Sequence, residues 1–177
     1  MGHLIIVSLE TLKGRRSIRS FKAEQITDAE LNAVLEAGTY APTAAGTQGA
    51  VIVAVQDPAD VAQLDAMNAA VLGKEGLHPY YGAPTILLVF ATEKAMVPET
   101  DCALVGGNLL NAAYAAGLGS CWIHRSKEMF ASAAGKTLLK KWGLLDNLTA
   151  FCSIALGYAD CPQPEAPARR EGYIVRV

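Results

Sequence analysis

The sequence has little charge, and what it has is nearly balanced in sign. Only 18% of its 177 residues are charged, and the formal net charge is −2 at pH 7. Proteins that bind nucleic acid or a membrane surface usually carry a basic excess, so we expect neither partner. No apolar run has membrane-spanning length, and the first residues lack the features of a secretory signal. We therefore expect a cytoplasmic protein.

Several motifs of common enzyme and metal sites are missing. The four cysteines, Cys102, Cys121, Cys152 and Cys161, form no CxxC pair, and the three histidines are scattered. Neither a zinc site nor a P-loop nor a GxSxG elbow is present. We expect no metal, and we interpret the cysteines as buried, reduced thiols.

Linkers and low-complexity tracts are also missing, so we expect a single domain over residues 1–177. Hydrophobic residues make up 51% of the chain, which is more than in an average soluble domain. Either the core is unusually large, or a partner covers part of an apolar surface. Self-association is the better explanation, because large exposed apolar patches are a liability on a monomer.

Hydrophobic periodicity predicts helices interspersed with strands. Short β-branched or apolar runs predict strands over 50–56, 85–91, 120–124 and 149–157. The opening residues predict a helix over 8–14 capped by Ser8, and Thr27 with Glu30 forms a capping box for a second helix that would end at Gly38. A helix over 100–116 is apolar nearly all round and must be buried on most sides. The pattern predicts an α+β fold, an α/β/α sandwich with a central mixed sheet.

Two basic clusters stand out in this weakly acidic chain. Arg15, Arg16, Ser17 and Arg19 fall within one short segment, and guanidinium groups at such spacing suit a phosphate dianion. A solvated basic turn is the alternative. Arg169-Arg170 follows a proline-rich stretch in the tail. This pair can contribute to the same site only if the tail folds back beside the first cluster.

A loop and a glycine pair complete the candidates. The loop over 41–48 has small residues that allow close backbone approach, and Thr43 and Gln48 can hydrogen-bond to a heterocycle edge. An ordinary connecting loop explains it equally. Gly117 and Gly119 follow a helix and precede a strand, so they are not a dinucleotide fingerprint.

The order of these segments resembles the nitroreductase family. RRSIRSF near the start, APTAAGTQ one helix later, the long helix with its turn GGNLLNAAYAAGLGSCWI, and the tail arginines carry the resemblance. It implies an intertwined homodimer with two FMN sites at the subunit interface. It also implies an oxidoreductase that passes electrons from NADH or NADPH to a small oxidised acceptor, such as a nitroaromatic or a quinone, by a ping-pong mechanism.

The resemblance also assigns roles to residues, all of them in cofactor binding. In the family, one segment holds the FMN phosphate, the ribityl chain and the pyrimidine end of the ring, and the residues that match it are Arg15, Arg16, Ser17 and Arg19. The tail residues that complete the phosphate site match Arg169 and Arg170. A loop from the other subunit lines the flavin and matches Pro42, Thr43, Ala44 and Gln48. The turn whose backbone faces the central ring, with an N–H able to donate to N5, matches Ile123 and His124.

The chain departs from the family pattern at one place in the loop. Many relatives have asparagine where Gly46 stands and a Pro-Trp or similar pair where Gly49-Ala50 stand. One polar contact to the flavin is thereby lost, which puts the ring-edge geometry in doubt but not the cofactor.

The flavin carries the chemistry, so no catalytic side chain is assigned. A non-catalytic FMN-binding or flavin-sensing protein is the alternative, and a specialised enzyme of this fold would need a lid insertion that the chain is too short to hold.

Overall fold

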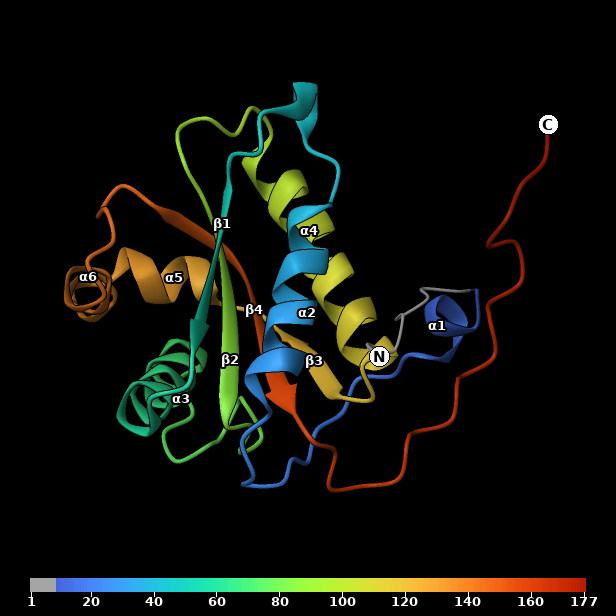
Figure 1. Cartoon of the computed structure of the whole chain (residues 1–177), viewed down its shortest axis with the longest axis horizontal. Coiled ribbons are helices and arrows are strands. Elements are labelled where there is room, and N and C mark those ends of the chain that lie inside the picture. The colour runs from blue at the N-terminus through green and yellow to red at the C-terminus, as the bar shows by residue number, and fades with distance from the viewer. Residues whose placement is uncertain (1–8) are drawn as a thin grey trace.

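In the computed structural model, which describes residues 9–177, one sheet is covered on both faces by helices (Figure 1). The elements are α1 (Leu9–Gly14), α2 (Asp28–Thr39), the 3-10 turn η1 (Ala44–Gly46), β1 (Ala50–Val55), α3 (Pro58–Leu72), β2 (Thr85–Ala91), α4 (Pro98–Ala115), β3 (Gly119–Ile123), α5 (Ser126–Ala131), α6 (Ala133–Lys141) and β4 (Thr149–Gly157). The expected α+β class and the three layers are confirmed. Ser8, the expected cap of the first helix, lies outside the described residues.

The strands pair in the order β1-β2-β4-β3, and each neighbouring pair is antiparallel. The sheet therefore differs from the mixed sheet that we expected. Within the described residues the parallel pairing is limited to an isolated bridge between Ser17 and Ser120. Hydrophobic runs identify strands that are covered on both faces, but they do not encode strand direction, which is why the sequence left it undetermined.

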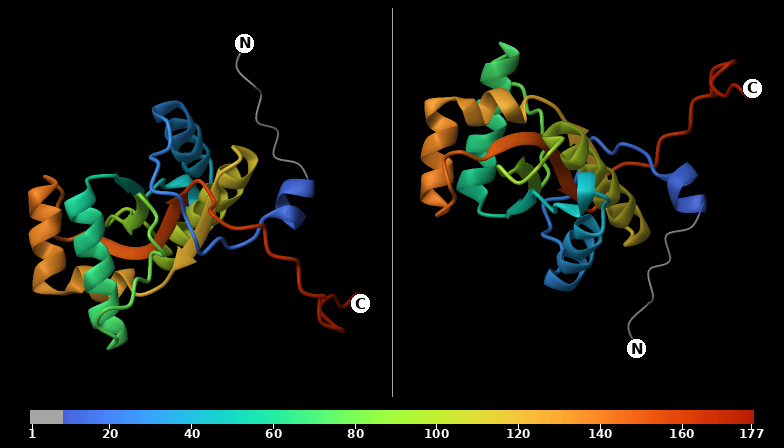
Figure 2. Two further views of the ribbon diagram at one scale, coloured as in Figure 1. Left: turned by 90° about the horizontal axis from the view of Figure 1, so that it is seen from below. Right: turned by 90° about the horizontal axis from the view of Figure 1, so that it is seen from above.

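Strand β2 lies in the middle and is buried along its whole length. Its side chains alternate between two cores: Ile86, Leu88 and Phe90 pack on the side of α3, α5 and α6, whereas Leu87 and Val89 pack on the side of α2 and α4. The two views of Figure 2 show these helical layers on opposite faces of the sheet. The rigid sheet thus holds both the start and the end of β3 in place.

Helix α4 packs unusually close to the sheet and to α2. A β-carbon on Gly106 would lie 2.6 Å from Trp122 Cζ3, and one on Gly38 would lie 2.7 Å from Leu109 Cδ2. Gly38 therefore serves close helix packing inside α2 and does not end that helix, which continues to Thr39. Glycine at these two contacts lets α4 approach both neighbours.

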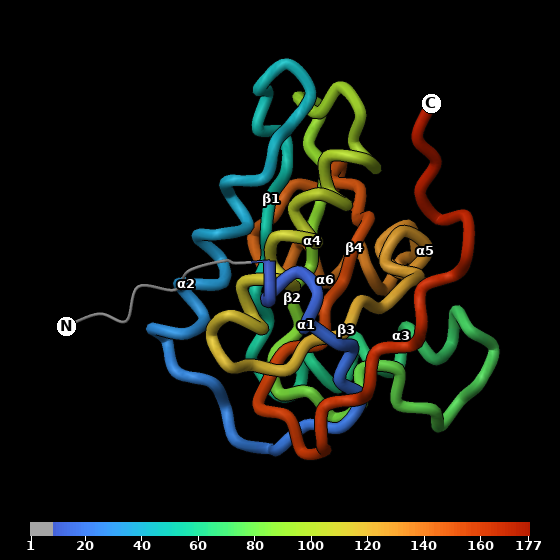
Figure 3. Tube along the Cα trace, turned by 90° about the vertical axis from the view of Figure 1, so that its right-hand side faces the viewer, coloured from blue at the N-terminus to red at the C-terminus, as the bar shows by residue number. Residues whose placement is uncertain are grey.

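The tail after β4 leaves the body of the chain (Figure 1). Residues from Pro162 onward are all exposed, including Tyr173, Ile174 and Val175. Figure 3 shows the tail and α1 together on the side of the molecule that carries β3. None of the helices within residues 9–177 is long and apolar enough to cross a membrane.

Candidate functional site

The first part of the candidate site lies along the outer edge of β3. Ile18 N–H donates to Ser120 O at 3.0 Å, and Ser17 forms the parallel bridge with Ser120, so the basic segment meets this edge near the start of the strand. Burial raises the pKa of the neighbouring Cys121 thiol, while the Arg19 guanidinium, the Ser17 hydroxyl and the Arg15 guanidinium act in the opposite direction. Arg15, Ser17 and Arg19 are thus near enough to Cys121 to act on its thiol.

A cavity of about 230 Å³ opens beside this segment. It is lined by Arg15 and Arg16, the turn from Gly117 to Ser120, Tyr114 of α4, and Cys161 with Gln163 at the start of the tail. Arg16 folds back onto its own backbone, with Nη1 donating to Lys13 O at 2.8 Å and to Arg15 O at 2.6 Å. Its Nε and the Ser120 hydroxyl are buried without a partner in the described chain. Such unpaired donors beside guanidinium groups suit an anionic ligand.

The turn after β3 lies at the far end of the same edge. Ile123 is buried and His124 is exposed. His124 is three positions after Cys121, which is about 10 Å along a strand. The structure thus places two of the sequence-predicted groups, the basic segment and the Ile123–His124 turn, on one edge of one strand.

The predicted loop lies elsewhere, at the other end of α4. Ala44 N–H donates to Asp101 Oδ1 in the first turn of α4 at 3.0 Å, and Gln48 N–H donates to Thr43 Oγ1 at 3.0 Å. Two neighbouring cavities of about 370 and 670 Å³ share Thr43 and Gln48, and Pro42 lines the second. Neither cavity is lined by a residue of the basic segment.

The loop also carries unusual backbone and unpaired polar atoms. Ala45 and Gln48 have φ of 50° and 49°, in the left-handed region that favours glycine. Within the described residues, Thr47 Oγ1 and Asp101 Oδ2 are buried without a partner. The bond to Asp101 holds the loop in this costly shape, and such strain is common at binding sites.

The tail arginines contact their own tail. Arg169 Nε and Nη2 donate to Pro167 O at 3.2 and 2.6 Å, and the Arg170 guanidinium lies 5.1 Å from the centre of the Tyr173 ring. The tail does reach the basic segment earlier, where Gln163 Nε2 donates to Gly14 O at 2.8 Å. The convergence of Arg169 and Arg170 on the phosphate site thus stays a prediction.

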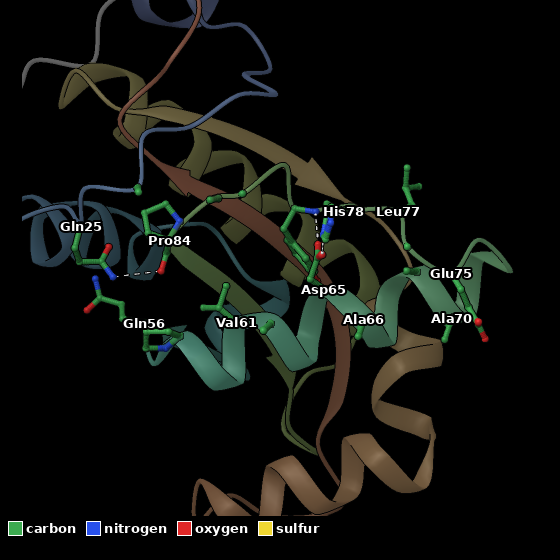
Figure 4. Close-up of a pocket in the computed structure, with 18 residues that line it drawn as sticks. Gln25, Gln56, Val61, Asp65, Ala66, Ala70, Glu75, Leu77, His78 and Pro84 are labelled. Carbon is green, nitrogen blue, oxygen red and sulfur yellow. Dashed lines mark hydrogen bonds and ion pairs between the residues drawn. The ribbon is translucent and has the colours of Figure 1, made fainter.

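Another cavity, of about 780 Å³, is a groove between α3 and the loop that precedes β2 (Figure 4). None of the twelve predicted site residues lines it. His78 Nδ1 lies 2.7 Å from Asp65 Oδ2 at one end, and Gln25 Nε2 donates to Pro84 O at 3.2 Å at the other. Tyr80 packs inward, with its hydroxyl on Ser153, so it supports the sheet, while Tyr81 is partly exposed.

Three side chains that hold the turn after β3 were not predicted from the sequence. Asn68, Ser153 and Arg125 come from α3, β4 and the cap of α5, and they bond to the turn or to each other. The one local sign was an asparagine inside an alanine-rich helix, where a buried amide needs specific partners.

Comparison with known proteins identifies the family. Residues 12–158 match the sequence profile described as the Nitroreductase family, so the chain belongs to that family. A crystal structure of a nitroreductase with bound FMN from Bacteroides fragilis NCTC 9343 is 28% identical, with a TM-score of 0.87, and the match covers 99% of this chain and 100% of that one.

Two curated relatives extend this result. One, from Archaeoglobus fulgidus and named for NADH dehydrogenase and NAD(P)H nitroreductase activity, is 29% identical over 85% of this chain and 84% of its own length. The other, the FMN reductase (NADPH) of Bacillus subtilis, is 30% identical over 66% of this chain and 53% of its own length. This chain therefore matches only about half of the second relative.

Proposed function

We propose that the chain is an FMN-dependent oxidoreductase that passes electrons from NADH or NADPH to a small oxidised acceptor, such as a nitroaromatic or a quinone, by a ping-pong mechanism. One observation supports it above the others. The basic segment pairs with Ser120 near the start of β3, and the Ile123–His124 turn ends the same strand, so groups suited to a phosphate and a backbone N–H suited to a flavin ring belong to the two ends of one strand. The FMN bound in the Bacteroides fragilis relative supports the same cofactor here.

The residues at this edge fit FMN. Arg15, Arg19 and Ser17 would hold the phosphate and ribityl chain, and the unpaired Arg16 Nε and Ser120 Oγ are further donors. Arg16 near the pyrimidine end would favour a reduced, anionic ring by charge attraction. When bound, FMN would supply the redox chemistry, because its ring can take a hydride equivalent from a reduced nicotinamide and later give up two electrons, with protons, to an acceptor.

We further propose that the site is shared between two copies of the chain. Asp101, which holds the loop, and Tyr114, which lines the cavity beside Arg15, are separated by about 20 Å of helix α4. The loop and the basic segment of one chain therefore do not line a common cavity. An exposed tail with apolar residues from Tyr173 to Val177 also favours an intertwined homodimer, because a partner can cover it.

The decisive experiment is an absorbance spectrum of the purified, FMN-reconstituted protein, followed by anaerobic NADPH and then an acceptor. We expect flavin bands that bleach with NADPH and return with a nitroaromatic or a quinone. Failure to retain FMN would contradict the cofactor assignment. Retained FMN that never bleaches, with NADH as with NADPH, would support the alternative of a non-catalytic flavin-binding protein.

A matched pair of variants ties the cofactor to the basic segment. Arg15→Ala should weaken FMN binding at least tenfold, because one charge-assisted contact to phosphate contributes about 1.5–3 kcal/mol. Lys140→Ala removes an exposed positive charge from α6, which lies on the opposite side of the molecule from α1 (Figure 1), and should leave FMN binding unchanged. Fluorescence quenching of FMN measures both affinities.

A further inference from the structure

Three buried polar side chains gather behind the turn that follows β3. Asn68, Tyr80 and Ser153 are at most 1% exposed, and they lie in an otherwise apolar core. Burying polar groups in such surroundings is unfavourable unless each is hydrogen-bonded. The bonds that they make are therefore informative, because they show what the core holds in place.

Two of the three side chains bond directly to the turn. Ser153 Oγ donates to Ile123 O at 2.9 Å and accepts from the Tyr80 hydroxyl at 3.0 Å. Asn68 Nδ2 donates to His124 O at 2.8 Å, and Asn68 Oδ1 accepts from Arg125 Nε at 2.8 Å. Two successive peptide carbonyls are thus held from the core side.

The direction of these carbonyls fixes the direction of an N–H group. Ser120 O faces the outer edge of β3, where it accepts from Ile18 N–H. Carbonyls alternate along a strand, so Ile123 O faces β4, as its bond with Ser153 requires. In a trans peptide the N–H points away from the C=O, so the His124 N–H faces the outer edge of β3, the edge on which Ile18 and Ser17 pair with Ser120.

We infer that Ser153 and Asn68 are positioning residues that aim the His124 N–H at N5 of FMN; the inference rests on the function proposed above. Arg125 shows that the turn is held under strain. Its φ is 81°, a left-handed conformation that is costly for arginine. The Arg125 side chain bonds to Asn68, so the amide of Asn68 bonds to both His124 and Arg125.

The inference predicts a change in redox potential. A donor aimed at N5 bonds to the lone pair of the oxidised ring, and this acceptor is weakened once N5 carries its own hydrogen. The His124 N–H therefore stabilises oxidised FMN more than reduced FMN. If the His124 N–H is no longer held in place, the ratio of the affinities for oxidised and reduced FMN should shift roughly three- to tenfold toward reduced FMN. For a two-electron couple this raises the midpoint potential of bound FMN by about 15 to 30 mV.

The test compares Ser153→Ala and Asn68→Leu with Tyr80→Phe as the matched control. Tyr80→Phe removes a hydroxyl from the same network but no bond to the turn. Burial raises the pKa of Tyr80 to about 12, so the lost group is a neutral donor at working pH. We expect the midpoint potential of bound FMN to rise in the first two variants and to stay at the wild-type value in Tyr80→Phe. Equal potentials in all three variants and wild type would overturn the inference.

A measurement on the wild-type protein covers the case in which the variants do not fold. The amide ¹H–¹⁵N resonance of His124 should shift on FMN binding, and an unmoved resonance would overturn the inference. The two proposals fail separately. Wild type that retains no FMN contradicts the proposed function, whereas wild type that is loaded and reducible, with potentials unmoved by the two variants, contradicts only the positioning role.

Discussion

The backbone N–H of Ala44 donates to Asp101 Oδ1 at 3.0 Å, and this bond ties the loop from Pro42 to Gln48 to the first turn of α4. The basic segment lies at the other end of the same helix, where Tyr114 and Arg15 line one cavity. About 20 Å of helix α4 therefore separates the two parts of the proposed site. In the proposed homodimer, two copies related by a two-fold axis, with antiparallel α4 helices, would each complete the site of the other.

The shared site can be tested by subunit complementation. Copies with Arg15→Ala and Arg19→Ala carry a defective basic segment, and copies with Pro42→Trp carry a defective loop. Pro42 is exposed in the single chain, so the added bulk should spare the fold. Each homodimer should lose FMN, whereas co-expressed chains should form heterodimers with one intact site. Flavin absorbance per purified heterodimer measures the recovery, and we expect about half of the wild-type value.

The control is the doubly defective chain, with all three substitutions in one copy, co-expressed with wild type. Its heterodimer has one defective half in each site, so it should bind little FMN. Heterodimers of the single-defect chains that stay colourless would contradict a site shared between subunits. A wild-type protein that sediments as a monomer when loaded with FMN would do the same.

The cysteines should differ sharply in reactivity. Burial raises the pKa of Cys102 to about 12 and also raises the pKa of Cys121 and Cys152, so these thiols stay protonated and enclosed. Cys161 is partly exposed and lines the cavity beside Arg15. We expect iodoacetamide to label Cys161 at least tenfold faster than the other three. Bound FMN should slow that labelling, as peptide mass mapping can show; equal labelling with and without FMN would place the phosphate elsewhere.

Asp60 makes stability depend on pH. Asp60 Oδ1 accepts from Lys141 Nζ at 2.5 Å, and Oδ2 accepts from Trp142 Nε1 at 2.8 Å. The hydrogen bond from Lys141 and then that from Trp142 hold the pKa of Asp60 below its ordinary value of 3.8. The ionised group stabilises the fold above pH 3.8, and the contribution is lost as pH falls through the lowered pKa of the folded state.

Asp60→Asn should therefore lower the free energy of unfolding at pH 7 by about 1 to 3 kcal/mol. The difference from wild type should shrink as pH falls below 3.8, since the unfolded wild-type chain then binds a proton at Asp60 that the folded chain does not yet bind. Urea unfolding at steps from pH 7 to pH 3 measures the effect, with Asp146→Asn in an exposed loop as the control. If the difference in the free energy of unfolding between wild type and Asp60→Asn stayed constant over this range, the charge of Asp60 would contribute nothing to stability.

Local features of the fold could be predicted because each depends on neighbouring residues. The capping box is present: Thr27 N–H donates to Glu30 Oε2 at 2.8 Å, and Glu30 N–H donates to Thr27 Oγ1 at 3.2 Å. Strand β2 is buried on both faces, as its uninterrupted apolar run indicated. Strand direction and the place of Gly38 inside α2 depend on contacts with distant residues, so no local pattern predicted them.

The candidate site also has a part that could be predicted from neighbouring residues and a part that could not. The basic segment was recognisable because its charges are adjacent in the sequence. Asn68 and Ser153 were not, because Asn68 lies 56 positions from His124, and Ser153 lies 30 positions from Ile123. An asparagine among alanines and a serine within an apolar strand have no functional signature until the fold brings them behind one turn.

The close packing of α4 on the sheet gives the last prediction. Gly106→Ala would place a methyl group 2.6 Å from Trp122 Cζ3 and 2.8 Å from Cys152 Sγ, closer than van der Waals contact allows. We expect a loss of about 1 to 3 kcal/mol in the free energy of unfolding, because overpacking forces side chains or backbone to move. Trp122 belongs to β3, so the strain falls on the strand that carries the candidate site.

Trp122→Phe should relieve that strain. The smaller ring leaves room for the methyl group, and the indole N–H that is removed has no partner within the described chain. The double variant should therefore be more stable than the sum of the single effects by about 0.5 kcal/mol or more, which a double-mutant cycle measures in urea. Strictly additive effects would mean that Gly106 and Trp122 do not share this contact, and that α4 can shift away from β3 without moving the edge on which FMN is proposed to lie.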